Sequence, residues 1–116
     1  MTIKQQNIKA DQRRWKRYEV EVAVKVTLSE SGQAFPFNAT GTNISEGGMR
    51  IVISREIELG RIVLLEVCLP YCQETLKLRA IIRSRNSFNY GIEFINASKY
   101  VQQVIVQHCR VFALLQ

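Results

Sequence analysis

The feature that most constrains the fold is a strict two-residue alternation in residues 19–28. Apolar side chains occupy every second position, and charged or small side chains lie between them. Because successive side chains of a β-strand point to opposite faces, this pattern predicts a strand with one buried and one solvated face. Such strands are typical of antiparallel sheets. The apolar positions are Val20, Val22, Val24, Val26 and Leu28.

Five further segments have the length and composition of strands, with turn-forming residues between them. Pro36, near the start of the second, indicates a sheet edge or a bulge, since proline cannot donate to a strand ladder. The fourth is so apolar that we expect it to be largely buried. The five segments are residues 33–42, 49–53, 61–69, 75–85 and 90–95.

The periodicity changes in the last segment of the chain, where residues of the apolar stripe recur at intervals of three and four. This spacing predicts an amphipathic helix, with Asn96 or Ser98 as its N-cap. The stripe consists of Val101, Val104, Ile105, His108, Cys109, Phe112 and Leu115. The fold class that we expect is therefore mainly β. It is a six-stranded antiparallel β-barrel, closed to protect its edges and followed by a C-terminal α-helix.

The length of 116 residues suits a single domain. Residues 1–11 are polar and lack periodicity, so we expect a flexible N-terminal tail, with residues 12–116 forming the domain. No apolar run approaches the roughly 20 residues of a membrane span, and the N-terminus lacks the apolar core of a signal peptide. We therefore expect a cytoplasmic protein without a membrane span.

Catalytic and metal chemistry have little support in this composition. His108 is the only histidine, and no set of serine, histidine and aspartate or pair of carboxylates stands out. The three cysteines, Cys68, Cys72 and Cys109, lack the spacing of a zinc site, so we expect buried, reduced thiols. The sequence thus predicts no enzyme activity, no metal and no cofactor.

One polar loop interrupts the strand-like sequence between residues 42 and 50. Asn43 and Ser45 carry short hydrogen-bonding groups that favour local turns. Gly47 and Gly48 allow a ligand or another backbone to approach closely. Taken alone, this segment is consistent with a wide hairpin loop.

A basic arm precedes the first strand and contains Arg13, Arg14, Trp15, Lys16 and Arg17. The planar fork of arginine can bind a phosphate with two hydrogen bonds, and it also matches the O6 and N7 acceptors of guanine. Trp15 either stacks on a base or anchors the arm to the barrel. Taken alone, the arm is consistent with a solvated basic segment, but together with the loop it predicts one anion-binding site.

These segments resemble the PilZ domains, which bind the bacterial second messenger cyclic di-GMP. The resemblance rests on Arg13-x-x-x-Arg17 and on Asn43-x-Ser45-x-x-Gly48, in this order. The segment Tyr90-Gly91-Ile92-Glu93-Phe94 is also similar to the last strand of the family. The resemblance extends from Arg13 to the C-terminus and implies the same fold of a six-stranded barrel and a helix.

The resemblance also implies roles for individual residues. Arg13 and Arg17 would hold guanine edges and phosphates, with Arg14 in support. Asn43 and Ser45 would hydrogen-bond to the ligand, Gly48 would keep the shape of the loop, and Gly47 would assist. Asn43 stands where the family often has aspartate, so it keeps an acceptor but lacks the charge. Either Arg83 or Arg85, on the strand before Tyr90, is a further candidate to contact the nucleotide.

The function implied is a ligand-switched adaptor in signalling, with an output such as motility or biofilm formation. Cyclic di-GMP would order the arm against the barrel and change a surface for a downstream protein partner. The outer side of the helix, with Val106 and Val111, is a candidate homodimer surface.

Two alternatives to this function belong to other classes. One is a nucleotide-independent PilZ-like interaction module. The other, a barrel that binds single-stranded nucleic acid, needs exposed aromatic side chains on a basic groove. The aromatic side chains in the predicted strands fit the core instead, so we expect no DNA or RNA partner. They are Phe35, Phe37, Tyr90 and Phe94.

Overall fold

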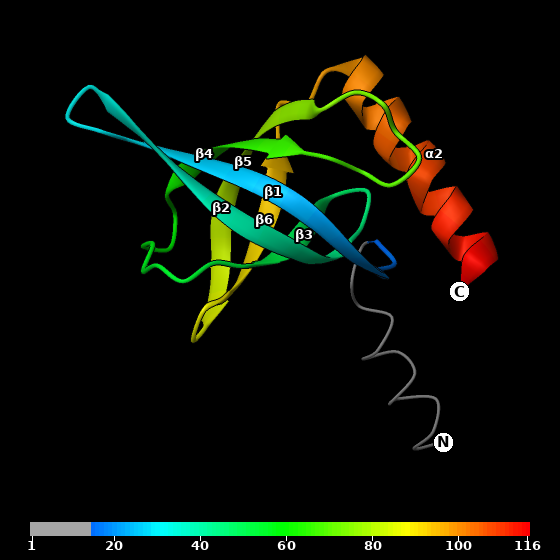
Figure 1. The fold of residues 1–116 in the computed structure, drawn as a ribbon, viewed down its shortest axis with the longest axis horizontal. Coiled ribbons are helices and arrows are strands. Elements are labelled where there is room, and N and C mark those ends of the chain that lie inside the picture. Colours follow the sequence, from blue (N-terminus) through cyan, green and yellow to red (C-terminus); the bar gives the residue numbers. More distant parts are fainter. Residues whose placement is uncertain (1–14) are drawn as a thin grey trace.

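The computed structural model describes residues 15–116, which form six strands and one helix (Figure 1). The predicted tail, and Arg13 and Arg14 of the basic arm, lie outside the described residues. The elements are β1 (Tyr18–Glu30), β2 (Gln33–Ile44), β3 (Gly48–Val52), β4 (Ile62–Val67), β5 (Leu76–Asn86), β6 (Asn89–Ile95) and α2 (Lys99–Leu115).

The strands form one closed barrel in the order β1-β2-β3-β6-β5-β4, and every neighbouring pair is antiparallel. Closure pairs the two strands that would otherwise be sheet edges, β1 and β4. The predicted fold class, a six-stranded antiparallel barrel with a C-terminal helix, is confirmed. Pro36 lies where β2 pairs with β1 but not yet with β3, which is the predicted edge position.

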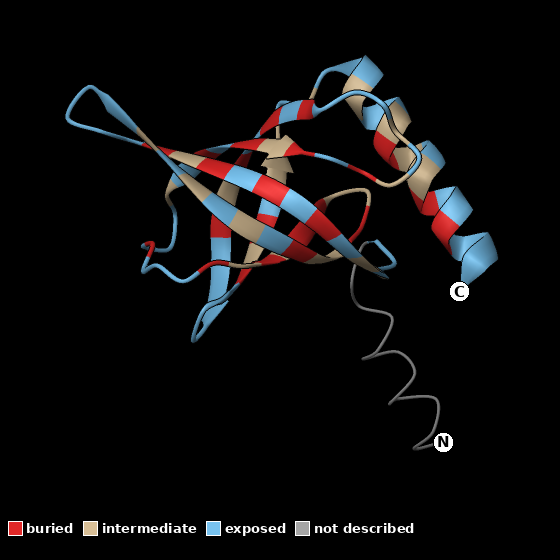
Figure 2. Ribbon diagram, viewed as in Figure 1, coloured by how far each residue is buried: buried red, intermediate tan, exposed pale blue. Residues whose placement is uncertain are grey.

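The alternation of β1 places Val22, Val24, Val26 and Leu28 inside the barrel, and Figure 2 shows the resulting stripes of buried and exposed residues. Tyr90 on β6 is fully buried. Its hydroxyl donates to the carbonyl oxygen of Arg55 at 2.6 Å and accepts from the Ile57 N–H at 3.0 Å. These bonds satisfy the hydroxyl and hold the β3–β4 connection against the core.

Two predictions about burial are wrong. In β4, Val63, Leu65 and Val67 are buried, but Ile62 and Leu64 are 45% and 54% exposed. The strand therefore has a solvated face, which its apolar composition on both faces concealed. The cysteines follow a similar pattern, because Cys109 is buried, Cys72 is half-buried and Cys68 continues the exposed face of β4. All three thiols are free.

The loop after β2 is shorter than the sequence indicated. Asn43 and Ile44 still belong to β2, where they pair with Arg50 and Met49 on β3. Only residues 45–47 therefore connect the two strands. Pairing across the sheet thus extends both strands into polar sequence that favours a turn.

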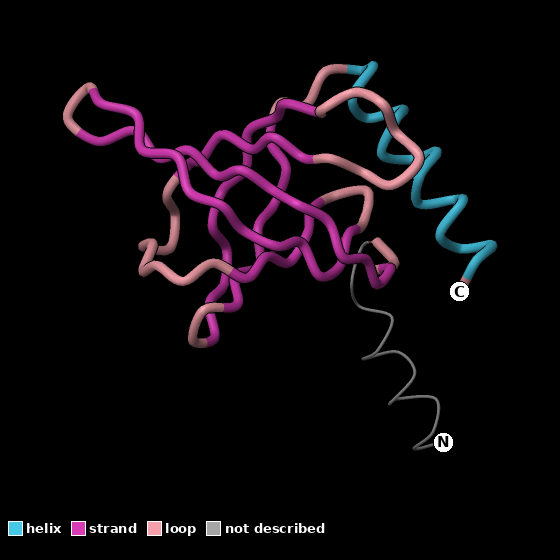
Figure 3. The backbone as a smooth tube through the Cα atoms, in the orientation of Figure 1, coloured by secondary structure: helices cyan, strands magenta, loops and turns pink. Residues whose placement is uncertain are grey.

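Helix α2 lies beside one end of the barrel, where β1, β3 and β5 begin and β2, β4 and β6 end (Figure 3). Ser98 is the N-cap, since its Oγ accepts from the Val101 N–H at 3.2 Å. The helix buries Ile105, Cys109 and Phe112. At its C-terminal end the side chain of Gln116 donates to the carbonyl oxygen of Glu19 at 2.7 Å.

The buried stripe of α2 ends earlier than predicted, because Leu115 is 64% exposed. His108 is half-buried, and its Nδ1 lies 2.8 Å from the carbonyl oxygen of Val104. Val111 is exposed as predicted, whereas Val106 is half-buried. Within residues 15–116 no helix is long and apolar enough to cross a membrane.

Candidate functional site

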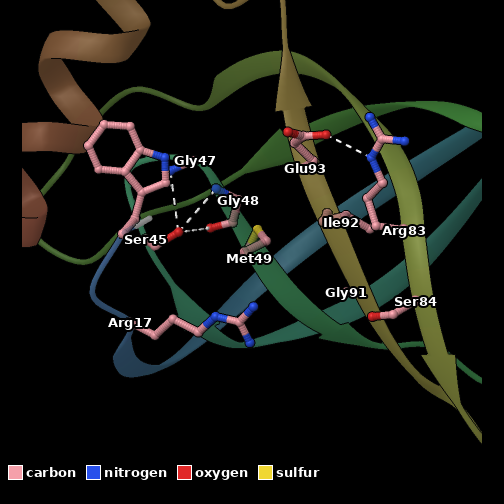
Figure 4. A pocket seen from close by; sticks show the side chains of 11 residues that line it. Arg17, Ser45, Gly47, Gly48, Met49, Arg83, Ser84, Gly91, Ile92 and Glu93 are labelled. Atoms are coloured by element: carbon pink, nitrogen blue, oxygen red, sulfur yellow. Dashed lines mark hydrogen bonds and ion pairs between the residues drawn. The ribbon is translucent and has the colours of Figure 1, made fainter. Parts of the chain in front are cut away.

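A cavity of about 340 Å³ opens at the barrel end beside which α2 lies (Figure 4). It is built by the described part of the basic arm, the β2–β3 loop, and strands β3, β5 and β6. The two segments that the sequence singled out therefore lie next to each other. The lining residues are Trp15, Arg17, Ser45, Gly47, Gly48, Met49, Arg83, Ser84, Gly91, Ile92 and Glu93.

Ser45 fixes the conformation of the loop. Its Oγ accepts from the backbone N–H groups of Gly47 and Gly48 at 3.3 and 3.2 Å, and it donates to the carbonyl oxygen of Gly48 at 3.3 Å. The Ser45 N–H donates to the same carbonyl at 2.8 Å. The residue is 7% exposed. The hydroxyl that the sequence assigned to the ligand is thus already used within the loop.

Gly47 and Gly48 lie at close approaches that a Cβ atom would disturb. A Cβ atom at Gly48 would overlap the carbonyl oxygen of Ile92 on β6. At Gly47 it would overlap the indole of Trp15. Glycine at these two positions therefore lets β6 and the arm pack directly against the loop backbone.

Trp15 separates this cavity from a second one of about 410 Å³, which lies between the loop and α2. Glu46, Phe94 and Val106 also line the second cavity. Since the indole lies on Gly47, the structure corresponds to the anchoring alternative for Trp15. The half-buried Val106 belongs to this cavity and not to the outer side of the helix.

Asn43 is next to the cavity but not among the residues that line it. Its Oδ1 is buried and has no hydrogen-bond donor in the part of the chain that the structure describes. An unsatisfied buried acceptor costs about 1–3 kcal/mol of stability, so a donor supplied to Asn43 Oδ1 would stabilise this region.

Among residues 15–116, two arginines and one glutamate supply the charges of the cavity wall. Figure 4 shows Arg17 extending from the arm along one side of the cavity, while Arg83 and Glu93 face each other on the strands opposite. Arg83 Nε donates to Glu93 Oε1 at 2.7 Å, and the two side chains are 61% and 50% exposed. An exposed pair of this kind contributes only about 0–1 kcal/mol, so an incoming anion can compete for Arg83.

Arg85, the alternative to Arg83, has other contacts. Its Nε donates to the carbonyl oxygen of Ser87 at 2.8 Å, and its Nη2 lies 3.4 Å from Glu56 Oε1. A bulge between Ile82 and Ser84 changes the register of β5 at this point. Bulges redirect side chains, and of these two arginines it is Arg83 that lines the cavity.

Sequence reasoning gave no site role to Ser84, Gly91 and Glu93, which all line the cavity. The signal available was the similarity around Gly91 and Glu93 to the last strand of the family. Ser84 pairs with Gly91 across β5 and β6, so only the strand register brings it to the site.

The loop also faces α2, as the electrostatics of Cys109 show. Burial and, to a smaller extent, the negative charge of Glu46 together raise the pKa of the Cys109 thiol to about 11. Glu46 therefore directs its charge toward the helix side. In residues 15–116, no three histidine, cysteine, aspartate or glutamate side chains lie close enough together to hold a metal ion.

A family model described as the PilZ domain matches residues 11–110. The fold is shared with an inhibitor of motility from Bacillus subtilis, MotI/DgrA, with a TM-score of 0.73 and 20% identity over 91% of this chain. This chain spans 53% of that protein. A comparison with curated protein sequences finds no match.

Two separately determined PilZ domains also share the fold. The PilZ domain of YcgR from Escherichia coli, solved with c-di-GMP, has a TM-score of 0.69 and 14% identity. That alignment covers 89% of this chain and 92% of that one. The PilZ domain of CeSA from a cellulose-synthesizing bacterium has a TM-score of 0.62 and 17% identity, covering 87% and 99% of the two chains.

Proposed function

The chain belongs to the PilZ domain family, and on this premise we propose that it binds cyclic di-GMP in the cavity between the basic arm and the β2–β3 loop. The proposal rests on one observation: Arg17 of the arm lines the same cavity as Ser45, Gly47 and Gly48. The E. coli YcgR domain, which shares this fold, was solved with c-di-GMP.

The chemistry of the wall suits this ligand. Cyclic di-GMP carries two phosphate charges and two guanines, and the forks of Arg17 and Arg83 match both kinds of acceptor. The predicted contacts of Arg13 and Arg14 would come from the part of the arm outside the described residues. Ser45 and the two glycines act by holding the loop open to the ligand.

Asn43 contacts the ligand only after a local rearrangement, because its Oδ1 is buried. A ligand that draws the arm or β3 into a new position would uncover this acceptor. Its unsatisfied state favours such a change, since any donor supplied there recovers a hydrogen bond.

The proposed output is that of an adaptor for a downstream protein. Trp15 contacts the loop and lines both the ligand cavity and the cavity beside α2. Movement of the arm on binding therefore changes the surface next to the helix. Ile62 and Leu64 add two exposed apolar side chains on one face of β4, which suit a protein partner.

Isothermal titration of the purified chain with cyclic di-GMP tests the proposal. We expect saturable binding by the wild type and its loss in the Arg13→Ala/Arg17→Ala double variant. A matched control is Lys25→Ala/Arg79→Ala, which removes the same charge from exposed strand positions that do not line the cavity. Absence of saturable binding by the wild type up to high micromolar ligand would contradict the proposal and favour a nucleotide-independent interaction module.

A further inference from the structure

Arg50 lies on β3, next in the chain to Met49 of the cavity wall, and it pairs with Gly91 on β6. Its neighbours Met49 and Ile51 are buried inside the barrel. Because side chains alternate along a strand, Arg50 points to the outer face, where it is half-buried. Gly91 lines the cavity, so Arg50 is paired with a residue of the cavity wall.

The guanidinium of Arg50 lies beside the bare backbone of Gly91. A Cβ atom at Gly91 would lie 3.6 Å from Arg50 Nη2, and it would overlap the hydroxyl of Ser84. The guanidinium and the hydroxyl therefore approach the same bare stretch of β6 backbone. Since Gly91 and Ser84 both line the cavity, the guanidinium of Arg50 lies at its border.

Arg50 differs from Arg83 and Arg85 in its partners, and from the exposed Arg79 in being half-buried. Arg61, Arg83 and Arg85 each pair with a glutamate. Among residues 15–116 the guanidinium of Arg50 has no ion pair, hydrogen bond or aromatic ring contact. A half-buried cation has lost part of its hydration without gaining a counter-charge, so it favours an anion or a strong acceptor.

The residue paired with Arg50 on β2 also lacks a hydrogen-bond partner for its side chain. Asn43 pairs with Arg50, and its buried Oδ1 has no donor in the described chain. The guanidinium extends toward Gly91 on β6 and does not bond to this acceptor. An unpaired donor and an unpaired acceptor thus lie on facing positions at the same side of the cavity.

We infer that Arg50 is a further ligand-binding residue of this site. Its guanidinium donates to a phosphate or to the O6 and N7 edge of a guanine at the border formed by Gly91 and Ser84. The inference rests on the proposed function. It places three arginines around the ligand: Arg17 from the arm, Arg83 from β5 and Arg50 from β3.

The test is isothermal titration of wild type, Arg50→Ala and Arg79→Ala with cyclic di-GMP at one salt concentration. We expect Arg50→Ala to weaken binding by about tenfold or more, the usual effect of losing a charged hydrogen bond. Arg79→Ala removes the same charge from an exposed position on β5 that does not line the cavity, and we expect a change below about twofold.

Equal affinities of Arg50→Ala and Arg79→Ala, with wild-type binding that Arg17→Ala abolishes, would overturn the inference and leave the proposed function standing. No binding by the wild type would overturn both. If thermal denaturation shows that Arg50→Ala does not fold, Arg50→Gln gives the same comparison, because glutamine keeps part of the aliphatic stem without the charge.

Discussion

The hydroxyl of Ser45 makes three hydrogen bonds inside the β2–β3 loop. Ser45→Ala removes the acceptor of two backbone N–H groups where little water can replace it. We expect the free energy of unfolding to fall by about 1–2 kcal/mol, measured by urea denaturation, and the affinity for cyclic di-GMP to fall with it.

Ser54→Ala is the control for this substitution, since Ser54 is exposed and outside the site. We expect a stability change within about 0.5 kcal/mol there. An equal loss of stability in both variants would show that the Ser45 hydroxyl does not hold the loop.

Glu93 competes with the ligand for Arg83 in the proposed site. Glu93→Gln removes the carboxylate of the ion pair and leaves the guanidinium available to an anion. We expect cyclic di-GMP to bind about twofold to fivefold more tightly, the scale of an exposed ion pair.

The matched control is Glu66→Gln, because Glu66 pairs with Lys25 and does not line the cavity. Titration calorimetry on both variants separates the local effect from the shared change in net charge. Weaker binding by Glu93→Gln would mean that the carboxylate itself contacts the ligand.

Individual site residues were only partly predictable from the sequence. Arg17, Ser45 and Gly48 follow from their motif spacing, and the structure brings all three to one cavity. The sequence does not distinguish Arg83 from Arg85, and only the pairing of β5 with β6 shows which of them lies at the cavity. No sequence motif indicates Arg50, because only its pairing with Gly91 brings it to the border of the cavity.

The contact between the arm and the loop can be followed by fluorescence, since Trp15 is the only tryptophan of the chain. A methyl group at Gly47 would overlap the indole. We expect Gly47→Ala to displace Trp15 into water, with a red-shifted emission maximum and weaker binding of cyclic di-GMP.

Gly32→Ala, in the β1–β2 turn, controls for effects of substituting glycine in general. Nothing lies within 4 Å of a Cβ atom there, although the positive φ of 79° strains an alanine. Its emission should match the wild type. An unchanged spectrum for Gly47→Ala would contradict the packing of Trp15 on the loop.

The packing of α2 predicts a pH dependence of stability. Burial, with a smaller contribution from Glu46, raises the pKa of Cys109 from 9.0 to about 11. The unfolded chain therefore loses this proton at a lower pH than the folded chain. Keeping the thiol protonated in the folded state therefore stabilises the fold. This contribution is fully present below pH 9 and is lost as the pH rises toward 11.

We expect the free energy of unfolding to decline more steeply between pH 9 and 11 in the wild type than in Cys109→Ala. Denaturant titrations at several pH values measure this slope, and the other titrating groups are common to both proteins. Parallel slopes would contradict the burial of the Cys109 thiol where α2 packs on the core.

Whole elements were easier to predict than their ends. The alternation of β1 and the stripe of α2 each identify one buried face, and burial in the structure agrees. β4 was misjudged because apolar residues occupy both of its faces, so composition suggested full burial. The loop was predicted too long because turn propensity is local, whereas strand pairing extends β2 through Ile44.

In the molecule as a whole, the proposed ligand cavity and α2 occupy the same end of the barrel. The β1–β2 hairpin projects at the other end (Figure 1). The long-range pairings that close the barrel bring the arm, the loop, β5 and β6 together. Family motifs revealed the arm and the loop, but the rest of the wall exists only once the barrel has closed.

The most direct test of the central claim is a ¹H–¹⁵N NMR titration of the chain with cyclic di-GMP. We predict saturable shifts at the backbone amides of Gly47, Gly48, Ser84 and Gly91, which line the cavity. The amide of Gly32, in the β1–β2 turn, should not shift. Saturable shifts centred away from the α2 end of the barrel, or no shifts at all, would contradict the account.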